Sequence, residues 1–181
     1  MRGERVRNSQ DLDATQWPPS APATGTVGNT SIEDPIETTH LLDDPCTALA
    51  DQDLTALNLT TGRVDTDTAS SAADACVWER SEHSGNRADL IVMTENANGL
   101  DDIRQQNQDS ELFAETQIGE YSAVHASTFD RRDRGRCDLW IGVNESEVIY
   151  IFVALRDVPE ADDPCDYADQ VGEAAIANLT S

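Results

Sequence analysis

Four cysteines constrain the fold of this chain more than any other feature. They are Cys46, Cys76, Cys137 and Cys165, and no two of them form a C-x-x-C motif. The local geometry of a zinc ribbon or of a thioredoxin-like redox pair is therefore missing. The three histidines of the chain also show no ligand spacing relative to the cysteines. We expect structural disulfides rather than a metal site or free thiols.

The segments around the cysteines favour one of the three pairings that four cysteines allow. Asp44-Pro45-Cys46 and Asp163-Pro164-Cys165 are near-copies, in which aspartate suits the N-cap and proline the first position of a helix. Cys76 and Cys137 each open a strand-like run. Because the intervening elements return the chain to its starting end, we expect the pairs Cys46–Cys76 and Cys137–Cys165. Each pair closes a loop of roughly thirty residues, worth about 3–4 kcal/mol in the chain-entropy model.

The apolar pattern predicts an α+β domain with two disulfides, built mainly from an antiparallel sheet packed with N- and C-terminal helices. The expected helices cover residues 45–57, 100–108 and 164–179. Strand-like runs with turn residues between them predict three hairpins. The expected strand pairs are 76–80 with 88–94, 113–117 with 121–127, and 139–143 with 148–155.

The chain divides into a polar start and a folded domain. Residues 1–40 contain Pro18-Pro19 and a stretch rich in Gly, Thr and Ser, without a sustained apolar period. We expect a disordered tether over 1–40 and the disulfide-linked domain over 41–181. No apolar run has the length of a transmembrane helix, and no signal peptide is visible at the start. Since disulfides persist in oxidising compartments, an exported protein supplied without its leader is favoured over a cytosolic protein or a mis-assigned start.

The charge of the chain excludes several classes of partner. Its net charge is −23, from 35 acidic and 12 basic residues, and every basic residue is arginine. Such a chain repels phosphate backbones and anionic membrane surfaces, so we expect no nucleic-acid partner and no direct membrane binding. Contact with a membrane would come only through a lipid anchor outside this sequence.

The cysteine pattern resembles the actinobacterial exported domain of unknown function numbered 3558, whose members are commonly secreted lipoproteins. The matching positions are Asp44-Pro45-Cys46, Cys76-Val77-Trp78, Cys137 and Cys165. The resemblance covers about residues 41–181 and implies a cell-envelope location and a small α/β sandwich. It implies no activity, because the family has no assigned catalytic residues. The lipobox cysteine of a lipoprotein is not present, so a lipid anchor is only an inference from the resemblance.

One basic cluster contrasts with the acidic chain. It is a candidate site for an anion or an acidic partner, because arginine binds carboxylates and phosphates with paired N–H groups. The alternative is a loop whose arginines pair with the acidic surface of the protein itself. The four residues are Arg131, Arg132, Arg134 and Arg136.

Two histidines are the candidates for catalysis. His83 lies next to a predicted turn and His125 in the middle of a predicted strand, where ordinary structural histidines are also common. Catalysis would require a nucleophile within hydrogen-bond reach and an orienting carboxylate. The chain contains no G-x-S-x-G, H-E-x-x-H, Gly-rich phosphate loop or EF-hand loop. We expect no metal and no cofactor.

These observations lead to three functional hypotheses. The first is an exported cell-envelope protein that acts as a non-catalytic binding or accessory module, with an unknown envelope protein or small ligand as its partner. The second is a secreted hydrolase that uses His125 or His83 with a carboxylate. The third is a purely structural or stress-protective secreted protein.

Overall fold

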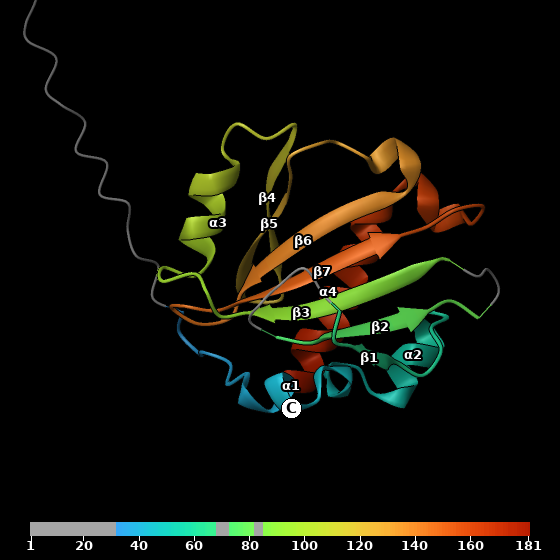
Figure 1. Ribbon diagram of the computed structural model, residues 1–181, viewed down its shortest axis with the longest axis horizontal. Helices are drawn as coiled ribbons and strands as arrows, with labels where there is room; N and C mark the ends of the chain where they lie inside the picture. Colours follow the sequence, from blue (N-terminus) through green and yellow to red (C-terminus); the bar gives the residue numbers. More distant parts are fainter. Residues whose placement is uncertain (1–31, 68–72, 82–84) are drawn as a thin grey trace, which may run out of the picture. The chain divides into compact units, whose positions relative to one another are not determined.

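A seven-stranded antiparallel sheet forms the centre of the computed structural model, which describes residues 32–67, 73–81 and 85–181 (Figure 1). The order of the strands is β1-β2-β3-β7-β6-β5-β4. Two meanders, β1 to β3 and β4 to β7, therefore join where β3 pairs with β7. The expected α+β class with an antiparallel sheet is confirmed. The strands are β1 (Arg63–Asp65), β2 (Ala75–Glu79), β3 (Arg87–Met93), β4 (Leu112–Ile118), β5 (Tyr121–Ser127), β6 (Arg136–Gly142) and β7 (Val148–Ala154).

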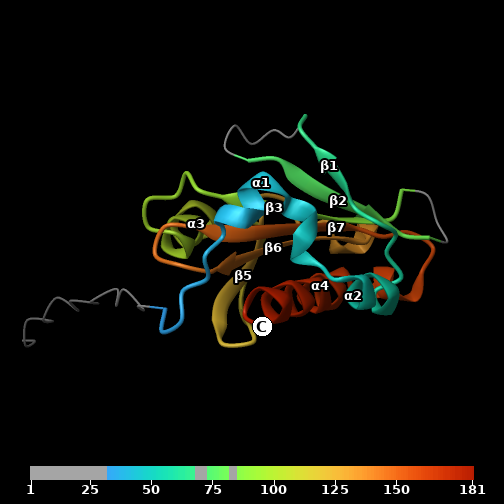
Figure 2. The same ribbon diagram turned by 90° about the horizontal axis from the view of Figure 1, so that it is seen from below.

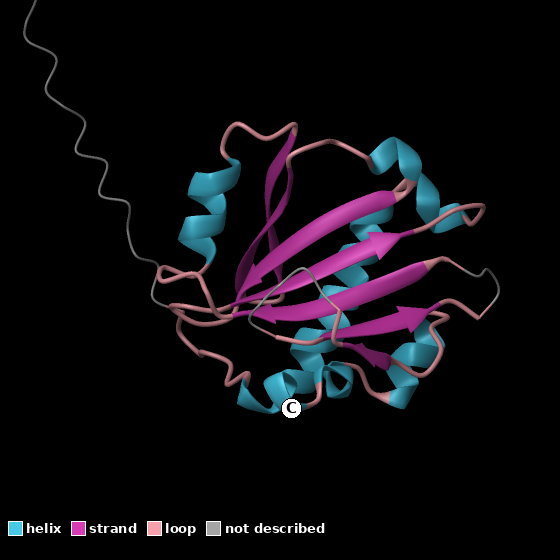
Figure 3. Ribbon diagram, in the orientation of Figure 1, coloured by secondary structure: helices cyan, strands magenta, loops and turns pink. Residues whose placement is uncertain are grey.

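Helices surround this sheet (Figure 3). The longest described helix is α4, with 16 residues. None of the helices in the described ranges is both long and apolar enough to cross a bilayer. The α-helices are α1 (Thr39–Asp43), α2 (Asp51–Ala56), α3 (Leu100–Asn107) and α4 (Pro164–Leu179), and the 3-10 turns are η1 (Pro45–Ala48), η2 (Arg132–Arg134) and η3 (Pro159–Asp162).

The alternation of side chains along the strands divides the core between two faces. Leu139 and Ile141 of β6 point toward α4, which runs beneath the sheet in Figure 2. Residues of α1, η1 and α2 join the same main core. On the opposite face α3 buries Leu100 and Ile103 in a smaller cluster. The sheet is therefore covered along one face and by one short helix on the other.

The structure contains the two predicted disulfides, Cys46–Cys76 and Cys137–Cys165. The helix openings act as expected, because Asp44 accepts a hydrogen bond from the Cys46 N–H. Asp163 accepts the N–H of Asp166 at the start of α4 in the same way. The first disulfide links η1 to β2 and the second links β6 to α4, so each one ties a helical element to the sheet.

One expectation about the N-terminal third was wrong. The single helix over 45–57 is divided into η1 and α2, because Leu49 and Ala50 have extended backbone angles. Residues 32–40, which fall within the expected tether, belong to the described part of the chain, and α1 begins there at Thr39. Ile36 is only 4% exposed, so the final part of the expected tether packs into the core. The rest of that segment lies outside the described residues.

Candidate functional site

A groove lies where the N-terminal segment, the β4–β5 turn and the end of α4 meet. Figure 2 shows the three segments beside one another. The groove has a volume of about 870 Å³, within the range of ligand-binding pockets. We call it the acidic groove. Its lining residues are Asp34, Pro35, Ile36, Glu37, His40, Gly119, Glu120, Tyr121, Glu173, Ile176, Ala177, Leu179 and Thr180.

Carboxylates dominate the rim of the acidic groove. All four are exposed, and none forms an ion pair with any residue in the described ranges. The lining contains one histidine and no arginine, so the negative charge at the rim is not compensated locally. The four carboxylates are those of Asp34, Glu37, Glu120 and Glu173.

The floor of the acidic groove is apolar. Ile36, Tyr121 and Ile176 are each less than a tenth exposed and pack into the main core. Pro35 and Ala177 add exposed apolar surface to the walls. The groove therefore presents apolar contact area surrounded by negative charge.

Long-range hydrogen bonds hold the N-terminal wall of the groove in place. The Tyr121 hydroxyl donates to the Asp34 carbonyl at 2.7 Å, and the Ile36 N–H donates to the Val143 carbonyl at 2.9 Å. Burial and then the nearby carboxylates of Asp34 and Glu120 raise the pKa of Tyr121, which therefore stays a protonated donor. The groove is a built feature of the fold rather than a gap beside a loose end.

The arginine cluster lies among carboxylates of the protein itself. Arg132 forms an ion pair with Asp130 at 2.6 Å, and its hydrogen bonds hold the pKa of Asp130 down at about 2. Arg131 lies over the Phe129 ring, 5.4 Å from its centroid. A second hollow of about 480 Å³ beside Arg132 is lined by Asp130, Asp133, Asp162, Asp163 and Pro164. An anion entering there would meet more carboxylates than arginines.

The other two arginines of the cluster lie in η2 and at the start of β6. Arg134 is exposed in η2 and Arg136 begins β6, next to the buried Cys137 but on the opposite face. Anion or partner binding by this loop stays a prediction.

His125 lies in the interior, between β5 and α4. It is 9% exposed, and its Nε2 is 2.7 Å from Asp169 Oδ1 of α4. The carboxylate that the hydrolase hypothesis requires is therefore present. Beside the ring, however, are the sulfurs of Cys137 and Cys165, which are joined in a disulfide and offer no thiolate for attack. The other candidate, His83, lies outside the described residues.

The sheet face away from α4 carries acidic groups beside aromatic rings. Burial raises the pKa of Asp89 to about 6, against the opposing effect of Arg87 and Arg63. Within the described structure, Asp89 Oδ1 is buried without a hydrogen-bond partner. Tyr150 donates a hydrogen bond to Asp138, two strands away from Asp89. These groups lie on the face where α3 covers only part of the sheet.

One known protein family matches almost the whole chain. The family described as "Protein of unknown function (DUF3558)" matches residues 6–178. The chain belongs to the DUF3558 family. The resemblance predicted from the cysteines is confirmed, and the match begins well before residue 41. Neither the curated proteins nor the solved structures that were compared give a match.

Membership of the DUF3558 family supplies no activity. The acidic groove could not be predicted from the sequence, because its walls come from three segments far apart in the chain. Each segment by itself looks like an ordinary polar turn or helix end. One sequence signal did exist: Ile36 is an apolar residue within a polar stretch, and in the structure it is buried against the domain.

Proposed function

We propose that this DUF3558 protein is an exported binding module that holds a basic, amphipathic peptide segment of a partner in the acidic groove. The observation that carries the proposal is the set of four unpaired carboxylates around an apolar floor. Lysine or arginine side chains of the partner would contact the rim, and its apolar side chains would pack on Ile36 and Ile176. Export is supported by the two disulfides, which are typical of oxidising compartments.

The charge of the whole chain supports the same partner chemistry. A net charge of −23 attracts cationic partners over long range and speeds their association at low ionic strength. The rim charges then select among these partners, because they are not neutralised by neighbouring arginines. The apolar floor distinguishes an amphipathic segment from a simple counterion.

A binding titration with a synthetic peptide of alternating lysine and leucine tests the proposal. We expect saturable 1:1 binding that weakens as salt rises. The double variant Glu37→Gln/Glu173→Gln should bind about 10-fold more weakly, because it removes two rim charges from the contact. The matched control is Asp67→Asn/Asp109→Asn, which removes two exposed charges that do not line the groove.

Two results would contradict the proposal. One is an equal loss of affinity in both double variants, which would mean that only the net charge attracts the peptide. The other is equal binding of a peptide with glutamate in place of lysine.

A further inference from the structure

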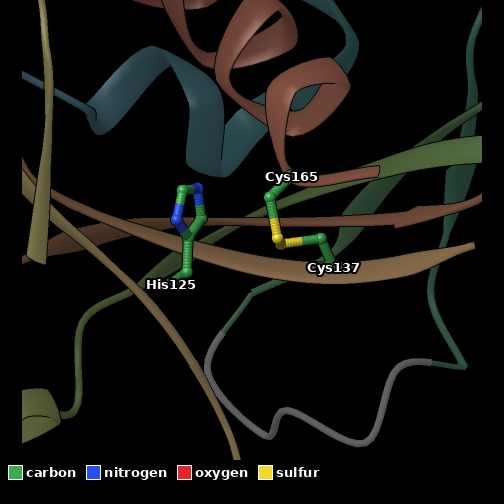
Figure 4. A group of neighbouring side chains, drawn as sticks. All are labelled: His125, Cys137 and Cys165. Carbon is green, nitrogen blue, oxygen red and sulfur yellow. A yellow bond between two sulfur atoms is a disulfide. The ribbon is translucent and has the colours of Figure 1, made fainter. Parts of the chain in front are cut away.

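Three side chains from three different elements meet between the sheet and α4. A ring nitrogen of His125 and the sulfurs of Cys137 and Cys165 all lie within 4.8 Å of one another (Figure 4). All three residues are buried. Within the described ranges, no other set of histidine, cysteine and carboxylate groups satisfies this spacing.

The register of β5 and β6 and the position of α4 bring these three side chains together. His125 pairs with Leu139 across β5 and β6, so Cys137 is its diagonal neighbour on the same face of the sheet. Helix α4 packs on the same face of the sheet. Asp163 caps its N-terminus, so Cys165 lies in the first turn of the helix. Asp169 follows one turn later and lies 2.7 Å from His125 Nε2.

We propose that Cys137, Cys165 and His125 form a redox-gated zinc site. In the oxidised protein the sulfurs are bonded to each other and supply no thiolate. A small dithiol can break the Cys137–Cys165 bond, forming its own disulfide while two electrons and two protons pass to the cysteines. Zn²⁺ then displaces both thiol protons to solvent and forms two zinc–sulfur bonds and one bond to the imidazole.

The spacing of the group suits zinc. Zinc–sulfur bonds are about 2.3 Å and zinc–nitrogen bonds about 2.0 Å, so the ligand atoms on one ion lie within about 4.6 Å of each other. The observed limit of 4.8 Å is close to this value, and the two sulfurs would move apart from their bonded positions to hold the ion. The fourth position falls to water. Asp169, whose Oδ1 lies 2.7 Å from His125 Nε2, orients the ring in the way that carboxylates hold zinc-bound histidines from behind, which leaves Nδ1 for the ion.

The other disulfide is a control within the same molecule. Cys46 and Cys76 also join a helical turn to a strand, but no described histidine completes a ligand group with them. Reduction should therefore create a metal site at one pair only.

The test uses the full chain with Cys46→Ala/Cys76→Ala, reduced with dithiothreitol and desalted without oxygen. Added Co²⁺ should bind 1:1 and give a thiolate-to-cobalt charge-transfer band and the visible bands of tetrahedral cobalt, both lost when Zn²⁺ is added. The unreduced protein and reduced Cys137→Ala/Cys165→Ala should give neither band. His125→Ala should weaken zinc binding at least ~10-fold. Equal cobalt spectra from the two double-cysteine variants would overturn the proposal.

A second measurement covers the case in which the reduced variants do not fold. The wild-type chain is reduced, supplied with Zn²⁺ and treated with an alkylating reagent, and the labelled cysteines are identified by mass spectrometry. We expect zinc to slow labelling of Cys137 and Cys165 at least ~10-fold relative to Cys46 and Cys76. Equal labelling of all four cysteines would overturn the proposal, whether or not the reduced chain is folded.

Discussion

Gly62 lies where the first disulfide leaves no room for a side chain. A Cβ at this position would be 2.5 Å from Cys76 Sγ and 2.6 Å from Trp78 Nε1. Gly62→Ala should therefore lower the free energy of unfolding by about 1–3 kcal/mol, the usual cost of overpacking. Urea denaturation measures this loss. In a Cys46→Ala/Cys76→Ala background the loss should be smaller, since the contact with the sulfur is gone. An unchanged loss would mean that the disulfide does not limit the room at position 62.

Asp89 makes the stability of the protein depend on pH. Its pKa is about 6 in the folded protein, above the usual value of 3.8, because burial disfavours the charged form. A raised folded pKa means that the native state binds the proton more tightly. The contribution of the protonated Asp89 carboxyl to the free energy of unfolding is complete at low pH and is lost as pH rises from about 4 to 6.

The variant Asp89→Asn removes this titration. Relative to wild type, its free energy of unfolding should increase by about 1–3 kcal/mol between pH 4 and pH 7. Urea denaturation across that range checks the result, with the exposed Asp109→Asn as a control for the loss of one charge. A difference between Asp89→Asn and wild type that does not vary with pH would show that burial does not govern this carboxyl.

At the level of elements, α4 approaches the sheet closely because Gly172 faces β6. A Cβ at this position would be 3.1 Å from both Ile141 Cδ1 and Leu139 Cδ2. Gly172→Val should lower the free energy of unfolding by about 2–3 kcal/mol through overpacking of this interface. The control Gln170→Val places the same side chain at an exposed position of α4 and should cost well under half as much. Equal losses would contradict close packing at position 172, because helix propensity favours valine over glycine and cannot itself cause a loss there.

The elements that could be predicted from the sequence are those with a local signal. Helix α4 has an aspartate cap, a proline at its first position and a regular apolar period, and its predicted bounds match the structure. The division between η1 and α2 has no such signal, because Leu49 and Ala50 are acceptable residues in a helix. Cys46, in the turn just before them, is bonded to β2, and such a tertiary constraint leaves no mark in the local sequence.

At the level of the whole molecule, the class of the fold and the disulfide pairing could be predicted from the sequence. The sets of side chains that could bind a metal or a ligand could not. The Asp-Pro-Cys segments that start two helices, and the elements that return the chain to its starting end, were enough to predict the disulfide pairing. The proximity of His125 to Cys137 depends on the register of β5 and β6, and the acidic groove on three segments distant in the chain. Both arrangements appear only when the strands are paired and α4 is in place.

We expect this DUF3558 protein to work as an oxidised domain held by two disulfides, with the zinc-binding form arising only where a dithiol reduces Cys137–Cys165. The most direct test is to isolate it from its own cells after rapid acid quenching and to alkylate it without a reductant. We expect no label on any of the 4 cysteines, a label on all of them after reduction, and linked peptides for Cys46–Cys76 and Cys137–Cys165 in an unreduced digest. Complete labelling without reductant would contradict the account, because it would place the working protein in a reducing compartment.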